Sequence, residues 1–255
     1  MCGRYAIIDG KKIFLTFEKM KNLEMRGQPF DALPRYNAAP TDSLPVIAMR
    51  HQKPGIERMR WWLIPHTSKD GQPLKGPDNR PLAAFNARGE TLEMSRMFLP
   101  YFTNARCLVP ADAFYEWKKI PVTAVVRGKK KESFERQPVV FRMKDDRMFM
   151  FAGLFSVWKN ELGEEFPSFA IITTEPNELM SPIHNRMPVI LEEKNFDPWL
   201  DRDNKNTGEL KDLLVPYPAE KMKAYPVSKL VNSNRNDVPE CLTPIETETS
   251  LFSSK

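Results

Sequence analysis

Hydrophobic residues along this chain gather in short blocks that prolines and charged residues separate. Within residues 11–20, the apolar residues Ile13, Phe14, Phe17 and Met20 share one face of a helix, which predicts an amphipathic helix. Residues 89–102, 178–183 and 209–214 are also predicted to be helical. The predicted helices are therefore few and short.

Most other apolar blocks are predicted to be strands. They are residues 44–49, 57–65, 106–117 (strand, turn, strand), 138–144, 148–158, 168–175, 187–191 and 222–227. Residues 68–81 are rich in Gly, Pro and Asp and predict a loop, and residues 127–138 predict a charged connection. Many strands at short spacing with few helices favour an α+β fold with mostly antiparallel sheet.

The chain shows no internal repeat and no break in composition. We therefore predict one domain over residues 1–238, followed by a loose polar tail over residues 239–255. Apolar residues make up 41% of the 255 residues, which is typical of globular proteins. No apolar run is long enough to span a membrane and no signal-peptide pattern opens the chain, so we expect a cytoplasmic protein.

Charge and cysteine usage narrow the class of partner. The 38 Lys and Arg against 33 Asp and Glu give a net charge of +5, which permits a nucleic-acid partner without requiring one. The cysteines and histidines are scattered, at Cys2, Cys107, Cys241, His51, His66 and His184. This spacing argues against a disulfide framework and against a metal site. We expect no metal, no cofactor and a monomer.

Cys2 stands directly behind the initiator methionine in the opening MCGRY. If Met1 is removed, Cys2 carries a free α-amine beside its thiol, with reference pKa values of roughly 7.7–8.0 and 8.5. Such an aminothiol forms an imine with an aldehyde and closes to a thiazolidine, whereas toward an acyl group the thiolate attacks alone. Gly3 leaves room for a ligand, and Arg4 is suited to hold an anion.

Three further segments place polar groups among apolar residues. Glu116, flanked by aromatic residues, is either a surface residue of an alternating strand or a carboxyl with a raised pKa. His184 lies in a predicted turn and is either structural or a proton carrier. Asn86 and Arg88 either cap a helix or orient a substrate and grip a phosphate.

These segments occur together in a specific order. The chain carries MCGRY (1–5), YNAAPT (36–41), RWWLIP (60–65), FNARGET (85–91), RCLVPADAFYEWK (106–118) and SPIHNRMPVIL (181–191). With this set the chain resembles, from residue 1 to about residue 230, the abasic-site processing family, also called SOS response-associated peptidases. It departs from that family at Trp62, where a glycine is common, and in the charged stretch 127–137, which is long for the family.

The resemblance implies that Met1 is removed and that Cys2 binds the ring-opened aldehyde of an abasic site in single-stranded DNA. The product would be a thiazolidine crosslink. Asn86 would position the Cys2 amine, Glu116 would transfer protons, and His184 would promote sugar ring opening or imine formation. The implied fold is one α+β domain with a curved, barrel-like, mostly antiparallel sheet.

By the same resemblance, six residues are predicted to bind DNA: Arg4, Arg88, Arg186, Asn37, Pro40 and Trp61. The arginines would contact phosphates beside the lesion. For Trp61, stacking on DNA and packing in the core stay open as alternatives. The implied setting is DNA repair and the SOS response, in the cytoplasm and on the nucleoid when bound to DNA.

Other functions stay open from the residues alone. Class II glutamine amidotransferases also begin MCG and use the cysteine to hydrolyse an amide. A thiol peptidase would pair Cys2 with His184 on external peptides, although self-processing that exposes Cys2 suits the peptidase label better. A plain DNA-binding module would bind single strands in a salt-sensitive way and form no covalent product.

Overall fold

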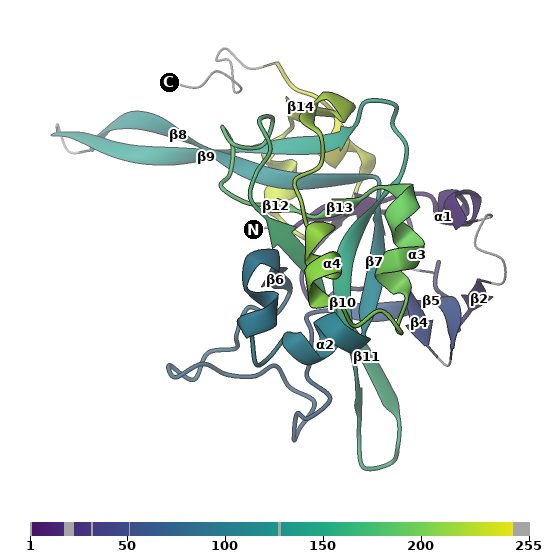
Figure 1. Ribbon diagram of the computed structural model, residues 1–255. Coiled ribbons are helices and arrows are strands. Elements are labelled where there is room, and N and C mark those ends of the chain that lie inside the picture. Colours follow the sequence, from purple (N-terminus) through teal and green to yellow (C-terminus); the bar gives the residue numbers. More distant parts are fainter. Residues whose placement is uncertain (1, 18–22, 32, 51, 127–128, 247–255) are drawn as a thin grey trace.

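The computed structural model describes residues 2–17, 23–31, 33–50, 52–126 and 129–246. Five strands close into a barrel at the centre of the molecule (Figure 1). In order around the barrel they are β11 (Glu165–Thr174), β10 (Phe149–Lys159), β7 (Arg106–Ala111), β4 (Ser43–Arg50) and β5 (Lys53–Trp61). These neighbours pair antiparallel. A short parallel pairing of Ser168 with Arg60 and of Phe169 with Trp61 closes the ring between β11 and β5.

Four short strands extend the barrel sheet. They are β2 (Glu24–Met25), β6 (Asn86–Arg88), β12 (Met187–Pro188) and β13 (Ile190–Leu191). The predicted strand over residues 187–191 is thus interrupted at Val189, whose amide donates to the carbonyl oxygen of Ile172. The predicted α+β class and the curved, mostly antiparallel sheet are confirmed.

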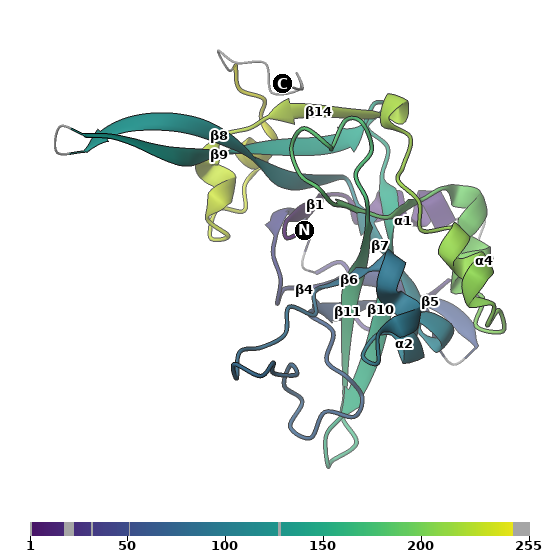
Figure 2. The same cartoon turned by 60° about the vertical axis from the view of Figure 1, so that its left-hand side comes forward.

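A second sheet of five strands lies beside the barrel. Its order is β14 (Met222–Pro226), β9 (Lys129–Met143), β8 (Ala113–Val126), β1 (Tyr5–Ile7) and β3 (Arg35–Ala38). Strands β8 and β9 stay paired as far as Val126 opposite Lys129, and their outer half leaves the body as a two-stranded ribbon (Figures 1 and 2). The predicted charged connection is therefore wrong over residues 129–138, because pairing with β8 overrides the low strand propensity of the lysines.

Short helices surround the sheets. The α-helices are α1 (Gly10–Phe17), α2 (Leu99–Asn104), α3 (Phe196–Leu200) and α4 (Thr207–Asp212). The 3₁₀ helices are η1 (Gly89–Met94), η2 (Glu193–Asn195), η3 (Ala219–Lys221), η4 (Lys229–Asn232) and η5 (Pro239–Leu242). No helix in the described part of the chain has the length and apolarity needed to cross a membrane.

Two helix predictions need correction. The predicted helix 89–102 is split into η1 and α2, because Ser95 is extended and its hydroxyl accepts a hydrogen bond from the amide of Phe98 at 3.2 Å. Residues 178–183 form turns, since the side chain of Asn177 accepts from the amide of Met180 and closes a local turn. The helix predicted over residues 11–20 is confirmed as far as Phe17, and its last three residues lie outside the described part.

Aromatic side chains fill the barrel and the space between the two sheets. Trp61 is fully buried, stacks on Phe169 with ring centroids 6.2 Å apart, and meets the edge of Tyr5 at 5.0 Å. On the second sheet, Phe114 stacks on Phe141 at 5.0 Å. Full burial of one such side chain contributes about 1.5–3 kcal/mol. This core therefore fixes β1, and with it the N-terminal segment, against the barrel.

The end of the described chain packs on the second sheet. Cys241 is fully buried and belongs to a small cluster with Tyr115, Val140 and Val231. Val227 forms a β-bridge with Pro244. Over residues 239–246 the chain is therefore packed and not loose as predicted, because its apolar residues cover the outer face of β8 and β9, and the rest of the predicted tail lies outside the described residues.

Candidate active site at the N-terminal cysteine

Cys2 lies just before β1, which begins at Tyr5, and is fully buried. The side-chain amide of Asn86 donates a hydrogen bond of 2.7 Å to the carbonyl oxygen of Cys2. Asn86 is held in place because β6 pairs in register with β11, with Asn86 opposite Ile171. Its Oδ1 is buried and has no hydrogen-bond partner among the described residues. The nitrogen of this amide thus holds the N-terminal segment, while its buried oxygen stays available as an acceptor.

Glu116 lies on β8 and is 4% exposed. Burial raises the pKa of Glu116 to about 7, well above the ordinary value of a glutamate. Burial also raises the pKa of the Cys2 thiol, and the nearby carboxylate of Glu116 adds to this effect. Of the two alternatives for Glu116, the structure therefore favours the buried carboxyl. Both its protonated and its ionised form are populated near neutral pH.

His184 lies in the turn that leads into β12 and is half-buried. Its Nδ1 accepts a hydrogen bond of 3.1 Å from the amide of Arg186, which orients the ring. Burial lowers the pKa of His184, and the charges of Arg186 and Lys119 act in the same direction. The imidazole is therefore neutral at pH 7 and suited to accept a proton.

Arg186 connects the histidine turn to the strand pair that holds Asn86. Its guanidinium donates to the carboxylate of Glu90 at 2.6 and 2.8 Å and to the carbonyl oxygen of Thr173 at 2.6 Å. Thr173 is the register partner of Arg88, two residues after Asn86. Arg88 is exposed at the end of β6, where its side chain faces solvent.

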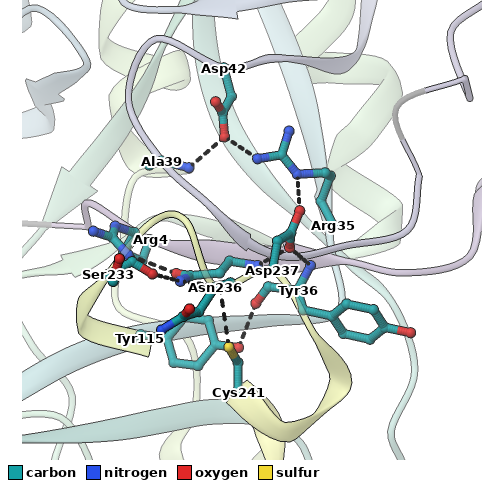
Figure 3. A network of polar contacts seen from close by, with 11 residues as sticks. Arg4, Arg35, Tyr36, Ala39, Asp42, Tyr115, Ser233, Asn236, Asp237 and Cys241 are labelled. Carbon is teal, nitrogen blue, oxygen red and sulfur yellow. Dashed lines mark hydrogen bonds and ion pairs between the residues drawn. The ribbon is translucent and has the colours of Figure 1, made fainter. Parts of the chain in front are cut away.

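The side chains of Arg4 and Asn37 hold the C-terminal segment through hydrogen bonds. Arg4 donates at 2.8 Å to both the Asn37 side chain and the carbonyl oxygen of Val231. Asn37 is fully buried, and its amide nitrogen also donates to the carbonyl oxygens of Ser233 and Asn236. Neighbouring Arg35 joins Asp42 to Asp237 at 2.6 and 2.5 Å, as Figure 3 shows.

Trp61 and Pro40, two predicted DNA-binding residues, differ in how deeply they are buried. The Trp61 ring is fully buried, and its Nε1 donates to the carbonyl oxygen of Phe85 at 2.9 Å. Pro40 is half-buried and precedes Thr41, whose φ of 88° places a non-glycine residue in the left-handed region. DNA contact by Trp61, Pro40 and Asn37 stays a prediction, and the packing of Trp61 favours the core alternative.

The structure thus brings Cys2, Asn86 and Glu116 together and attaches His184 to the same strand pair. Sequence reasoning missed Glu90 and Thr173, which accept hydrogen bonds from Arg186, and Lys119, whose charge acts on His184. The only sequence feature that could have identified Glu90 is its position two residues after Arg88. No local pattern identifies Thr173 or Lys119. Among the described residues, no three His, Cys, Asp or Glu side chains converge in a way that could hold a metal ion.

Comparison with known proteins covers almost the whole chain. The sequence model of a family described as SOS response associated peptidase (SRAP) matches residues 1–234. Abasic site processing protein YoqW of Bacillus subtilis is 35% identical over 243 residues, which cover 95% of this chain and 99% of that protein. Abasic site processing protein HMCES of Gallus gallus is 36% identical over 269 residues, covering 96% of this chain and 78% of that protein.

A solved structure shares the fold. The crystal structure of a protein from Bacteroides thetaiotaomicron superimposes with a TM-score of 0.75 and covers 96% of this chain and 100% of that chain. The two sequences are 23% identical, so this likeness concerns the fold alone.

Proposed function

The chain belongs to the SOS response-associated peptidase family, and we propose that it captures abasic sites in single-stranded DNA through a covalent bond to Cys2. Two relatives that align with nearly the whole chain are named abasic site processing proteins. The single observation that carries the proposal is the environment of Cys2, where the amide of Asn86 fixes its carbonyl group and Glu116 has a pKa of about 7.

The reaction begins with removal of Met1, which lies outside the described residues. Hydrolysis of the Met1–Cys2 peptide bond consumes one water and releases methionine, so that the α-amine of Cys2 becomes free. We assign this step to self-processing by the same site, with the Cys2 thiol as nucleophile. The buried Oδ1 of Asn86 then supplies an acceptor for the new amine.

Capture of the aldehyde proceeds in two bond-forming steps. The Cys2 amine adds to C1′ of the ring-opened sugar, and the resulting hydroxyl leaves as water to give an imine. The imine nitrogen still carries a proton, so the thiol sulfur adds to the imine carbon and the thiol proton returns to Glu116. The thiazolidine therefore contains all atoms of the two reactants except one water.

Each polar residue of the site has a role in these proton transfers. Protonated Glu116 donates to the departing hydroxyl and, once ionised, accepts the proton of the thiol. Neutral His184 accepts the hydroxyl proton of the closed sugar and thereby promotes ring opening. Exposed Arg88 is placed to contact a phosphate beside the lesion.

Intact-mass analysis of tag-free protein tests the proposal. The expected result is a chain without Met1 that, after mixing with an oligonucleotide bearing one abasic site, gains the mass of the oligonucleotide minus one water. Cys2→Ser, with Met1 removed by an added aminopeptidase, is the matched control, because it keeps a free amine but cannot close a thiazolidine. Its imine should be lost on denaturation and retained only after borohydride reduction.

A processed N-terminus that gives no adduct would contradict the proposal. In that case, Cys2-dependent release of ammonia from glutamine or turnover of external peptides would support a hydrolase instead. Salt-sensitive DNA binding that is unchanged in Cys2→Ala, with no covalent product, would support a binding module.

A further inference from the structure

The ribbon of β8 and β9 carries the excess positive charge of the chain. Residues 118–136 contain seven Lys or Arg and two Glu, a net charge of +5 that equals the net charge of all 255 residues. The rest of the sequence is therefore balanced in charge. Positive charge concentrated on an element that projects from the body (Figure 2) indicates a polyanionic partner.

Two cations of the ribbon stand directly opposite each other. Lys119 on β8 is the cross-strand partner of Arg136 on β9, and both are exposed. Within the described ranges, neither side chain has an acidic partner in an ion pair. Like charges in directly opposed positions destabilise a pair of strands. An anion bound between Lys119 and Arg136 would remove this repulsion.

Aromatic residues flank this pair of cations on the same face. Side chains on a strand alternate with a period of two, so Trp117, Lys119 and Pro121 share one face of β8. Phe134 lies opposite Pro121 and is 66% exposed, although it is a large apolar residue. Along the ribbon, this face therefore presents Trp117, then the two cations, then Phe134.

The face begins close to the candidate active site, because the positive charge of Lys119 acts on His184. Glu116 immediately precedes Trp117 on β8, and its side chain lies on the opposite face of the strand. Pro121 is four residues from Trp117, which is about 13 Å along an extended strand. Proteins that bind single strands combine cations along the phosphate backbone with aromatic rings on which bases stack.

We propose that Lys119, Arg136 and Phe134 bind the single strand of DNA that leads away from the captured lesion. Lys119 and Arg136 hold a phosphate between them, and Phe134 stacks on a base. This inference rests on the proposed function of the site. It adds a contact surface on the DNA flank, several nucleotides from the reacting sugar.

Fluorescence anisotropy with a tetrahydrofuran analogue of the abasic site tests the inference, because this analogue has no aldehyde and binds without crosslinking. Lys119→Gln with Arg136→Gln should lower affinity about tenfold at low salt. It should also reduce the slope of log affinity against log salt by about 0.7, since the two cations hold one phosphate and each phosphate contact to a single strand contributes roughly 0.7. Phe134→Ser should lower affinity about fivefold or more without changing the slope.

The matched control removes the same charge elsewhere. Lys194 and Arg202 are exposed beside α3, on the side of the molecule away from the ribbon (Figure 1). Lys194→Gln with Arg202→Gln should leave affinity and slope at the values of the unaltered protein. An equal loss in this control, or no loss in the ribbon variant, would overturn the inference.

Two further experiments test whether the lower affinity of the ribbon variant comes from a lost contact with the single-stranded flank. Shortening one flank of the oligonucleotide should weaken binding of the unaltered protein and not that of the ribbon variant. A loss seen only with a duplex flank would overturn the single-strand assignment. At subsaturating DNA, the ribbon variant should crosslink less DNA than the control variant, in line with its lower affinity. Absence of crosslinking by the unaltered protein would contradict the proposed function and would leave the anisotropy result standing.

Discussion

Both terminal nitrogens of the Arg186 guanidinium donate hydrogen bonds to the carboxylate of Glu90, at 2.6 and 2.8 Å. The Arg186 side chain is 16% exposed and that of Glu90 is 46% exposed. A DNA phosphate that approaches Arg186 must therefore compete with the Glu90 carboxylate. The carbonyl oxygen of Thr173, 2.6 Å from the same guanidinium, would keep Arg186 in place when Glu90 is displaced.

Glu90→Gln is therefore expected to strengthen DNA binding. We expect affinity for the tetrahydrofuran analogue to rise about two- to fivefold at low salt, because a partly exposed ion pair contributes about 1 kcal/mol or less. The measurement is fluorescence anisotropy over a salt series. Glu93→Gln is the matched control, since Glu93 lies on the same 3₁₀ helix and pairs with Lys211. Weaker binding by Glu90→Gln would show that Glu90 is needed to position Arg186.

The buried carboxyl of Glu116 predicts the pH dependence of crosslinking. The protonated form acts as the acid, so the crosslinking rate should fall as pH rises through about 7. Glu116→Gln should lower the rate about a hundredfold and abolish this alkaline decline. Single-turnover crosslinking followed on denaturing gels between about pH 5.5 and 9 gives both quantities. A decline with the same midpoint in the variant would assign that titration to another group.

The same group links folding stability to pH. The folded-state pKa of Glu116, about 7, lies above that of an unfolded glutamate, about 4.3. Its favourable contribution is therefore complete below about pH 4.3 and is lost as pH rises to about 7. The free energy of unfolding in urea should fall over this window relative to Glu116→Gln. Parallel pH profiles for the two proteins would contradict this burial effect.

Local patterns predicted most strands, because alternation is a local property of the sequence. For the residues around Cys2 they left two alternatives each, and the resemblance carried by the six short segments implied their roles. The partners of those residues were not predictable in the same way. Arg4 bonds to Val231, 227 residues later, and the apolar residue that anchors the end of the chain is Cys241. The ribbon was misjudged because its strands are stabilised by pairing with each other and not by the composition of residues 129–138.

The two adjacent tryptophans differ in burial, which makes the core role of Trp61 testable. Trp61 is fully buried, whereas Trp62 is half-buried and donates through its Nε1 to the carbonyl oxygen of Leu82. Trp61→Ala should lower the free energy of unfolding by about 3–5 kcal/mol. Trp61→Phe keeps an aromatic ring in the core and should bind DNA as the unaltered protein does. Loss of DNA affinity in Trp61→Phe at unchanged stability would revive the stacking role of Trp61.

Asn37 is expected to stabilise the fold through the C-terminal segment. Its amide nitrogen donates to the carbonyl oxygens of Val231, Ser233 and Asn236 at 3.1, 2.9 and 2.8 Å, and its oxygen accepts from Arg4. Asn37→Ala leaves these buried acceptors without their donor, which costs about 1–3 kcal/mol per unsatisfied group. Urea unfolding should show a loss of about 3 kcal/mol, and hydrogen exchange should increase across residues 228–241.

Two substitutions determine whether this loss comes from the hydrogen bonds. Asn37→Asp keeps the size of the side chain and its bond to Arg4 but turns a carboxylate toward the carbonyl oxygens. It should therefore destabilise the protein at least as much as Asn37→Ala. Asn104→Ala, at an exposed position on α2, should change stability by less than about 0.5 kcal/mol. If Asn37→Asp instead unfolds like the unaltered protein, the bond to Arg4 alone holds the segment and the three carbonyl contacts contribute little.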